Sequence, residues 1–372
     1  MFRKPARKPL GMPAFLVTVV LTLSASSCGH TEASLPPASP DVVMQSIRDY
    51  GRSHQALLIP GTSQKPDQSD FAYSAHIRSI LVEEDFAQLE KIAQQNRVEK
   101  GRLLGGVWKV FAFYQGTGAP ASYGTPTEAD WQRHISTLKK WIAAYPKSTA
   151  ARLSLAYLNV NYSWVARGSG FADSVSDAQW KLFRQRNAEA KSLLLEAGSF
   201  NDKDPFWFQV MQLVCHNEGW DKAQARELFD QAVAFEPGYY HYYIEYSRYL
   251  LPQWYGQPGD IQAFADEISS RVPDPDGSMF YFWILANRAC YCQQPMEELR
   301  HASYEKLYKG YSSIVSLYGA SNLNANRFAF MATTFLDQPA ARDAFANITQ
   351  MDQSIWTYQS IYDDSHEWAT SP

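Results

Sequence analysis

Apolar side chains recur at helical spacing through most of this chain. The best-defined case precedes Pro237, where Ala225, Phe229 and Ala232 stand at positions i, i+4 and i+7. This spacing places the three side chains on one face of a helix, which the following proline stops. The segment 205–219 (PFWFQVMQLVCHNEG) predicts a partner helix before it. Strict alternation of apolar and polar residues, which would indicate strands, is missing, so the chain is predicted to be all-α.

The same pattern recurs along the chain, less regularly. Its further positions are Phe264 and Ile268 after Gly259-Asp260, then Phe328, Ala329, Ala341, Phe345 and Ile348, and more weakly Phe86, Leu89 and Ala93. Leu155 and Ala156 predict the start of another first helix. Turns are predicted at Pro146, Pro205, Pro237 and Pro273. The insertion 251–258 (LPQWYGQP) interrupts the spacing, so any array is degenerate.

Helix pairs with small and large residues in this order resemble the tetratricopeptide repeat, a pair of helices that recurs about every 34 residues. The resemblance implies a right-handed α-solenoid of degenerate helix pairs. A single pair cannot bury its apolar face alone, and stacking lets neighbours share those faces. The stack then leaves a concave surface, on which solenoids bind their partners.

Three stretches also resemble a family of bacterial proteins described as a domain of unknown function with tetratricopeptide-like helices. They are 106–116 (GVWKVFAFYQG), 141–168 (WIAAYPKSTAARLSLAYLNVNYSWVARG) and 236–260 (EPGYYHYYIEYSRYLLPQWYGQPGD). The resemblance covers most of the chain between about residues 71 and 345. It implies the fold and supplies no activity, so no functional residue is carried over from it.

The N-terminus has the order of an export signal. Four basic residues within the first eight precede the short apolar run 14–23, and Ala25-Ser26-Ser27 leads to Cys28. The run is too short to span a bilayer, which takes about 20 apolar residues. The Ala-Ser-Ser-Cys order resembles the lipobox of bacterial lipoproteins, in which the cysteine is acylated and the signal is cut before it. Cys28 is therefore predicted to be a lipidation site.

Plain secretion is the alternative, because the small residues 25–27 also fit the ordinary signal peptidase. In Gram-negative lipoproteins an aspartate after the cysteine retains the protein in the inner membrane. The residue here is Gly29, and the resemblance then implies an outer-membrane anchor that faces the periplasm. The predicted organisation is a signal peptide (1–27), the lipidated cysteine with a flexible Pro- and Ser-rich tether (28–70), a helical-repeat domain (71–352) and a C-terminal tail (353–372).

Charge and composition exclude some partners. The 372 residues carry a formal net charge of -4 with a pI near 6.1, which gives a nucleic-acid partner no electrostatic support. Among the four cysteines, Cys290 and Cys292 lack a second Cys or His pair at zinc spacing. Buried thiols are the expectation for these two and for Cys215.

No catalytic signature stands in the chain. We find no G-x-S-x-G, no H-E-x-x-H, no P-loop and no G-x-G-x-x-G. No two histidines share an i, i+4 helix face; those considered are His76, His134, His216, His241 and His301. We therefore predict no catalytic residue, no metal site and no cofactor.

The densest aromatic segment is 239–256 (YYHYYIEYSRYLLPQWYG). Its tyrosines at helical spacing favour a core position, with a groove that stacks on sugars or grips an apolar peptide as the alternative. Trp254 and Tyr255 differ, because they lie in the insertion. They either cover the concave face or contact a ligand. We take Trp254, Tyr255 and Tyr240 as candidate partner-binding residues.

These patterns favour a lipid-anchored, non-enzymatic envelope scaffold that binds a protein or peptide partner. One alternative is an enzyme acting on envelope polymer, with carboxylates such as Asp260 or Glu245 near the aromatic cluster. Another is an accessory protein of a secretion system or of a toxin–immunity pair.

Overall fold

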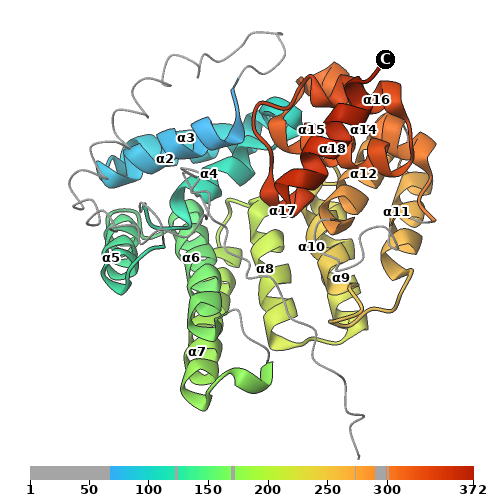
Figure 1. Cartoon of the computed structure of the whole chain (residues 1–372). Coiled ribbons are helices and arrows are strands. Elements are labelled where there is room, and N and C mark those ends of the chain that lie inside the picture. Colours follow the sequence, from blue (N-terminus) through green and yellow to red (C-terminus); the bar gives the residue numbers. More distant parts are fainter. Residues whose placement is uncertain (1–67, 122–124, 169–171, 273, 290–298, 300) are drawn as a thin grey trace, which may run out of the picture. The chain divides into compact units, whose positions relative to one another are not determined.

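The computed structural model describes residues 68–121, 125–168, 172–272, 274–289, 299 and 301–372 (Figure 1). Within these ranges the chain forms helices joined by turns, and the only strand-like pairing is one antiparallel bridge between Arg102 and Trp108. The prediction of an all-α fold is confirmed. The chain divides into two compact units.

The first unit contains Phe71–Lys100 and Val110–Glu218. Its helices are α2 (Asp70–Val82), α3 (Phe86–Glu99), α4 (Lys109–Thr117), α5 (Glu128–Ala144), α6 (Thr149–Arg167), α7 (Asp177–Gly198) and α8 (Pro205–Glu218), with a 3-10 turn η3 (Ala172–Ser174). Helix α6 packs against α5, α7 and α8, and Figure 1 shows α6 and α7 side by side. From α5 to α8 each helix thus contacts its successor, and α6 also contacts α8.

Local sequence sets several helix ends in this unit. Thr127 and Asp130 form a capping box at the start of α5, and Ser176 and Gln179 form one at the start of α7. In this motif each of the two residues accepts a backbone N–H that the helix leaves unsatisfied. Helix α6 ends before Gly168, which takes a φ of 73°.

A buried carboxylate fixes the start of α8. Asp204 is 3% exposed; its Oδ1 accepts the Phe206 backbone N–H (2.8 Å), and its Oδ2 accepts the Tyr114 hydroxyl (2.7 Å). Burial raises the pKa of Asp204, and the Arg97 guanidinium 3.6 Å away opposes that shift. The ring of Tyr114 stacks on Phe206 at 4.1 Å. Polar and aromatic contacts together hold α8 against α4.

Within the described ranges, the second unit contains residues 68–70, Gly101–Lys109 and the chain from Gly219 to Pro372. Its helices are α9 (Lys222–Phe235), α10 (His241–Tyr249), α11 (Asp260–Arg271), α12 (Asp276–Ala289), α14 (Tyr304–Tyr318), α15 (Asn322–Thr334), α16 (Gln338–Phe345), α17 (Gln353–Trp356) and α18 (Gln359–Thr370), with a 3-10 turn η2 (Leu104–Gly106). Helix α12 contacts α10, α11 and α14. The core is aromatic: Phe229 lies 4.8 Å from Tyr246 and 5.3 Å from Phe264.

Several predicted helices have the predicted bounds. Ala225, Phe229 and Ala232 are all buried on α9, and α8 occupies the segment predicted as its partner helix. Helix α11 begins at Asp260 and buries Phe264 and Ile268. The periodic pattern therefore located these helices and their inner faces.

Other boundaries differ from the prediction. Pro146 and Pro237 lie in turns, but Pro205 is the first residue of α8. A proline fits this position because the first helical N–H has no acceptor. Leu155 lies inside α6, which begins at Thr149. Pro273 lies outside the described residues.

The C-terminal segment 353–372, predicted as a tail, forms α17 and α18. Trp356 is 1% exposed and Ala369 is fully buried, and α18 contacts α15 and α16. This segment is part of the folded second unit.

None of the helices in the described ranges is long and apolar enough to cross a membrane.

Candidate functional site

Trp254 and Tyr255 lie on a tight turn between α10 and α11. The Trp254 N–H donates to the Leu251 carbonyl (2.9 Å), and the Tyr255 N–H donates to the Tyr249 carbonyl (3.3 Å). A Cβ on Gly256 would lie 1.8 Å from the Leu250 carbonyl oxygen. The turn therefore requires glycine at this position, because any side chain would collide with the backbone.

Both aromatic side chains are half-buried. The ring of Tyr255 stacks on Tyr249 at 4.3 Å, and the Trp254 ring lies 6.4 Å from Tyr255. The Tyr249 hydroxyl donates to the carbonyl of Trp220, which ties this cluster to the turn before α9. The structure thus holds the aromatic pair in place and leaves part of its surface accessible.

The charged groups flanking this turn are paired within the second unit. Lys222 Nζ lies 2.9 Å from Asp260 Oδ2, and Arg248 lies 3.4 Å from Glu245. Burial raises the pKa of Asp260, but hydrogen bonds from Lys222 and the Gln257 backbone outweigh it, and the net pKa is below its ordinary value. A general acid needs the opposite shift. Ion pairing therefore favours a structural role for these two carboxylates.

Tyr240 lies inside the second unit. Its side chain is 4% exposed, and its ring stacks on Trp283 at 3.9 Å with an interplanar angle of 15°. A partner on the surface does not reach this ring in the conformation described. Four neighbouring tyrosines are also buried, as the core interpretation of the segment predicts: Tyr239, Tyr242, Tyr243 and Tyr246.

The histidines do not converge on one site. His134 is buried with its Nε2 2.7 Å from the Thr117 carbonyl oxygen, and His241 is buried beside Tyr240. Burial lowers the pKa of both imidazoles. Among the described residues no group of His, Cys, Asp and Glu side chains has the arrangement of a metal site.

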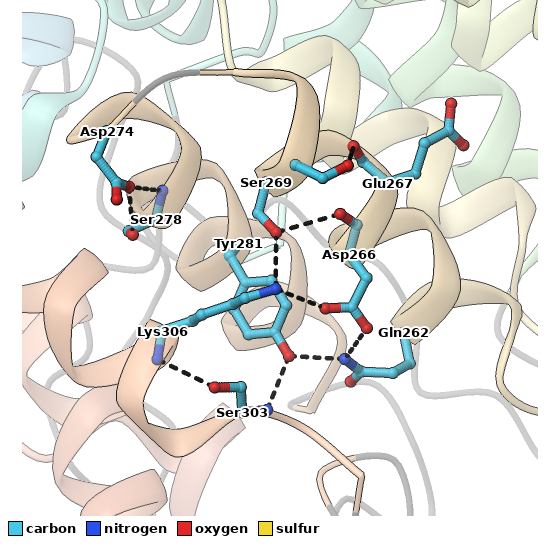
Figure 2. A network of polar contacts seen from close by, with 10 residues as sticks. Gln262, Asp266, Glu267, Ser269, Asp274, Ser278, Tyr281, Ser303 and Lys306 are labelled. Carbon is cyan, nitrogen blue, oxygen red and sulfur yellow. Dashed lines mark hydrogen bonds and ion pairs between the residues drawn. The ribbon is translucent and has the colours of Figure 1, made fainter.

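A polar network joins α11, α12 and α14 (Figure 2). The buried Tyr281 hydroxyl accepts Gln262 Nε2 (2.6 Å) and the Ser303 backbone N–H (2.8 Å). Lys306 Nζ donates to Asp266 Oδ1 (2.9 Å) and lies 5.0 Å from the Tyr281 ring centre. Burial raises the pKa of Tyr281, so the phenol is protonated at neutral pH. The network connects three helices and does not need a ligand to balance its charges.

The sequence interpretation missed one feature of the second unit, the segment Gly101–Lys109, which we call the strap. It is a tight hairpin: the Leu103 N–H donates to the Val107 carbonyl (2.7 Å), and the Lys109 N–H donates to Gly101 (3.0 Å). Gly105 and Gly106, at its tip, have positive φ values of 70° and 79°. The signal in the sequence was the Gly-Gly pair before Trp108, within a stretch read only as helical.

The strap inserts among residues distant in sequence. The Gly105 N–H donates to the Gly319 carbonyl (3.3 Å), Asn324 Nδ2 donates to the Gly105 carbonyl (3.2 Å), and Trp108 Nε1 donates to the Gly238 carbonyl (3.1 Å). Arg102 lies over the Trp108 ring at 3.2 Å. Burial lowers the pKa of Arg102 to about 10, although nearby Tyr318, Tyr240 and acidic groups oppose the shift.

Three predicted positions lie outside the described residues: the lipidation site Cys28, and Cys290 and Cys292. Cys215 is 1% exposed on α8, as predicted for a buried thiol.

Comparison of the chain with protein-family models, curated proteins and solved structures gives no match.

Proposed function

We propose that this chain is a lipid-anchored protein of the bacterial cell envelope that binds a protein or peptide partner. The observation that carries the proposal is the half-buried pair Trp254 and Tyr255, held on a turn that interrupts the helices. Aromatic residues with a fixed geometry and partial exposure commonly dominate binding energy at protein interfaces. Tyr240, whose ring is buried against Trp283, is not part of this proposed surface.

The fold supports a binding role. We propose that the helices form a tetratricopeptide-like right-handed α-solenoid. Its support is that α5 to α8 pack in succession, as do α11, α12, α14, α15 and α16. In addition, α6 contacts α8 and α12 contacts α10. In stacked helix pairs such contacts create an extended concave surface suited to a peptide or protein.

The proposed cellular location rests on the N-terminal sequence. We propose acylation at Cys28 and an anchor in the outer membrane, on the periplasmic side, from the order of basic, apolar and small residues before it. Acyl chains contribute about 0.8 kcal/mol per buried CH₂, so several chains on one residue anchor a protein stably.

Site-directed photo-crosslinking tests the binding surface in living cells. A photoreactive phenylalanine analogue at position 254 should give a discrete adduct. The same analogue at Tyr358, which is 65% exposed at the start of α18, should not. The double variant Trp254→Ala, Tyr255→Ala should keep its melting temperature within a few degrees and lose capture of the crosslinked partner.

Two outcomes contradict this assignment. If the double variant unfolds, the aromatic pair is part of the core. If it stays folded and captures the partner as the wild type does, the binding surface lies elsewhere.

A further inference from the structure

The strap has the features of a bound peptide. The chain enters the second unit at Gly101 and leaves it after Lys109, and these nine residues contact segments more than 100 positions away. Leu103 and Trp108, which flank the hairpin tip, are each 1% exposed. The strap forms no regular helix or strand of its own beyond the turn η2 and one bridge.

The residues that receive the strap form a defined surface, which we call the strap-binding surface. Its members are Gln68, Gly238, Trp283, Tyr318, Gly319, Ser321 and Asn324. It supplies backbone acceptors from three separate segments, one amide donor and two aromatic rings. Tyr240 packs against one member of this surface, because its ring stacks on Trp283.

The surface selects glycine at the hairpin tip. A Cβ on Gly105 would lie 2.4 Å from Ser321 Oγ, and a Cβ on Gly106 would lie 2.9 Å from the Tyr318 ring. Both glycines also have left-handed backbone conformations, which disfavour other residues. A segment that fits the strap-binding surface therefore needs a Gly-Gly turn, with an aliphatic residue before the turn and a tryptophan after it.

We propose that the strap-binding surface is a peptide-binding site for Gly-Gly hairpin turns, and that the chain's own strap occupies it in this structure. A partner segment of the same chemistry binds there when the strap is displaced. The proposal does not rest on the function assigned to Trp254 and Tyr255, because the two surfaces share no residue.

Because the strap is part of the same chain, it should compete strongly with any free peptide for the strap-binding surface. A tethered segment acts at an effective concentration of about millimolar, so a free peptide binds only when the strap is impaired. Gly105→Ala impairs it directly, since the new methyl group would collide with Ser321. Gly259→Ala is the matched control, because Gly259 also has a positive φ (88°) but a Cβ there meets no atom within 4 Å.

The test uses the full mature chain and a fluorescent peptide of residues 101–109 (GRLLGGVWK). The Gly105→Ala chain should bind the peptide at least tenfold more tightly than the wild type or Gly259→Ala. A peptide with alanine in place of Gly105 should not bind. If the folded Gly105→Ala chain fails to bind, or the wild type binds equally well, the proposal is overturned.

Hydrogen exchange of the wild-type chain provides a test that does not require a variant. The Gly105 amide donates a hydrogen bond to the Gly319 carbonyl, and Ile314 is fully buried on α14. The amide hydrogen of Gly105 should exchange at least tenfold faster than that of Ile314. Such a difference means that the strap opens without unfolding of its surface. If both amides exchange at the same rate, through global unfolding, the strap is a permanent part of the core and the proposal is wrong.

Discussion

His134 shows how one buried side chain links stability to pH. Its imidazole is 8% exposed on α5, and its Nε2 donates to the Thr117 carbonyl at the end of α4. Burial lowers the pKa of His134 to about 4, assisted by the nearby buried Arg78 and opposed by the hydrogen bond to Thr117. The folded state therefore keeps this group neutral at a pH where an unfolded chain takes up a proton.

The first prediction follows from this shift. The pKa of His134 in the folded state is lowered from 6.5. The stability that depends on a neutral imidazole is therefore present above pH 6.5 and is lost as the pH falls towards 4. The loss attributable to His134 is roughly 3 kcal/mol, because each pKa unit corresponds to about 1.36 kcal/mol. Urea unfolding at pH 7.5 and pH 4 measures it.

His134→Gln is the control, since an amide keeps a donor for the Thr117 carbonyl and does not titrate. Its stability should fall less than that of the wild type over the same pH interval. The remaining fall reports other groups, among them His241, whose pKa burial also lowers. An equal fall in both proteins would mean that His134 takes up its proton without disturbing the fold.

At the scale of elements, close approach of α14 to α12 depends on Gly310. A Cβ at this position would lie 2.2 Å from the Ser278 carbonyl oxygen and 2.8 Å from Phe282 Cβ. The first of these atoms belongs to the backbone and cannot rotate away. The two helices pack at this distance only because residue 310 has no side chain.

Gly310→Ala should therefore destabilise the protein by about 1–3 kcal/mol, as overpacking does. Alanine favours a helix over glycine by about 1 kcal/mol, so intrinsic propensity alone predicts the opposite sign. Chemical denaturation of the variant gives the net change in the free energy of unfolding, and so shows which of the two effects is larger. The matched control is Gly198→Ala on α7, where a Cβ meets Trp207 at an ordinary 3.4 Å. This variant should be equally or slightly more stable; if Gly310→Ala behaves like it, α14 shifts at little cost.

The helices differ in how well the sequence predicted them. Helices α9 and α11 carry one apolar face between clear boundary residues, and both were located from the pattern. Helix α6 is buried nearly all round, so its apolar residues do not form a single face. For this reason the sequence pattern placed the start of the helix at Leu155, several residues after its observed start at Thr149. A periodic signal exists only where one side of a helix meets solvent.

At the scale of the whole molecule, we propose that Cys28 determines location. Cys28→Ala should move the protein from the membrane fraction to the soluble envelope fraction, because no acyl chain is then attached. Fractionation followed by immunoblotting of wild type and variant measures the change. Cys215→Ala, which alters a buried thiol on α8, is the control and should stay with membranes. A Cys28→Ala protein that still sediments with membranes would refute the anchor.

The candidate site was predicted only in part. The sequence identified Trp254 and Tyr255 as unusual because aromatic residues stood in a turn, and the structure places both half-buried on that turn. Tyr240 was included with them, yet Trp283 covers its ring. A half-buried residue on a turn and a residue buried in the core look alike in sequence when both belong to one aromatic run.

The sequence by itself determined the all-α class and the inner faces of α9 and α11, because these depend on residues within a few positions of each other. Only the tertiary structure decided that residues 353–372 are helical and packed, and that Asn324 donates a hydrogen bond to the Gly105 carbonyl. Contacts such as Trp108 Nε1 to the Gly238 carbonyl join residues 130 positions apart. No periodicity encodes such a pairing, since it depends on how every intervening helix packs.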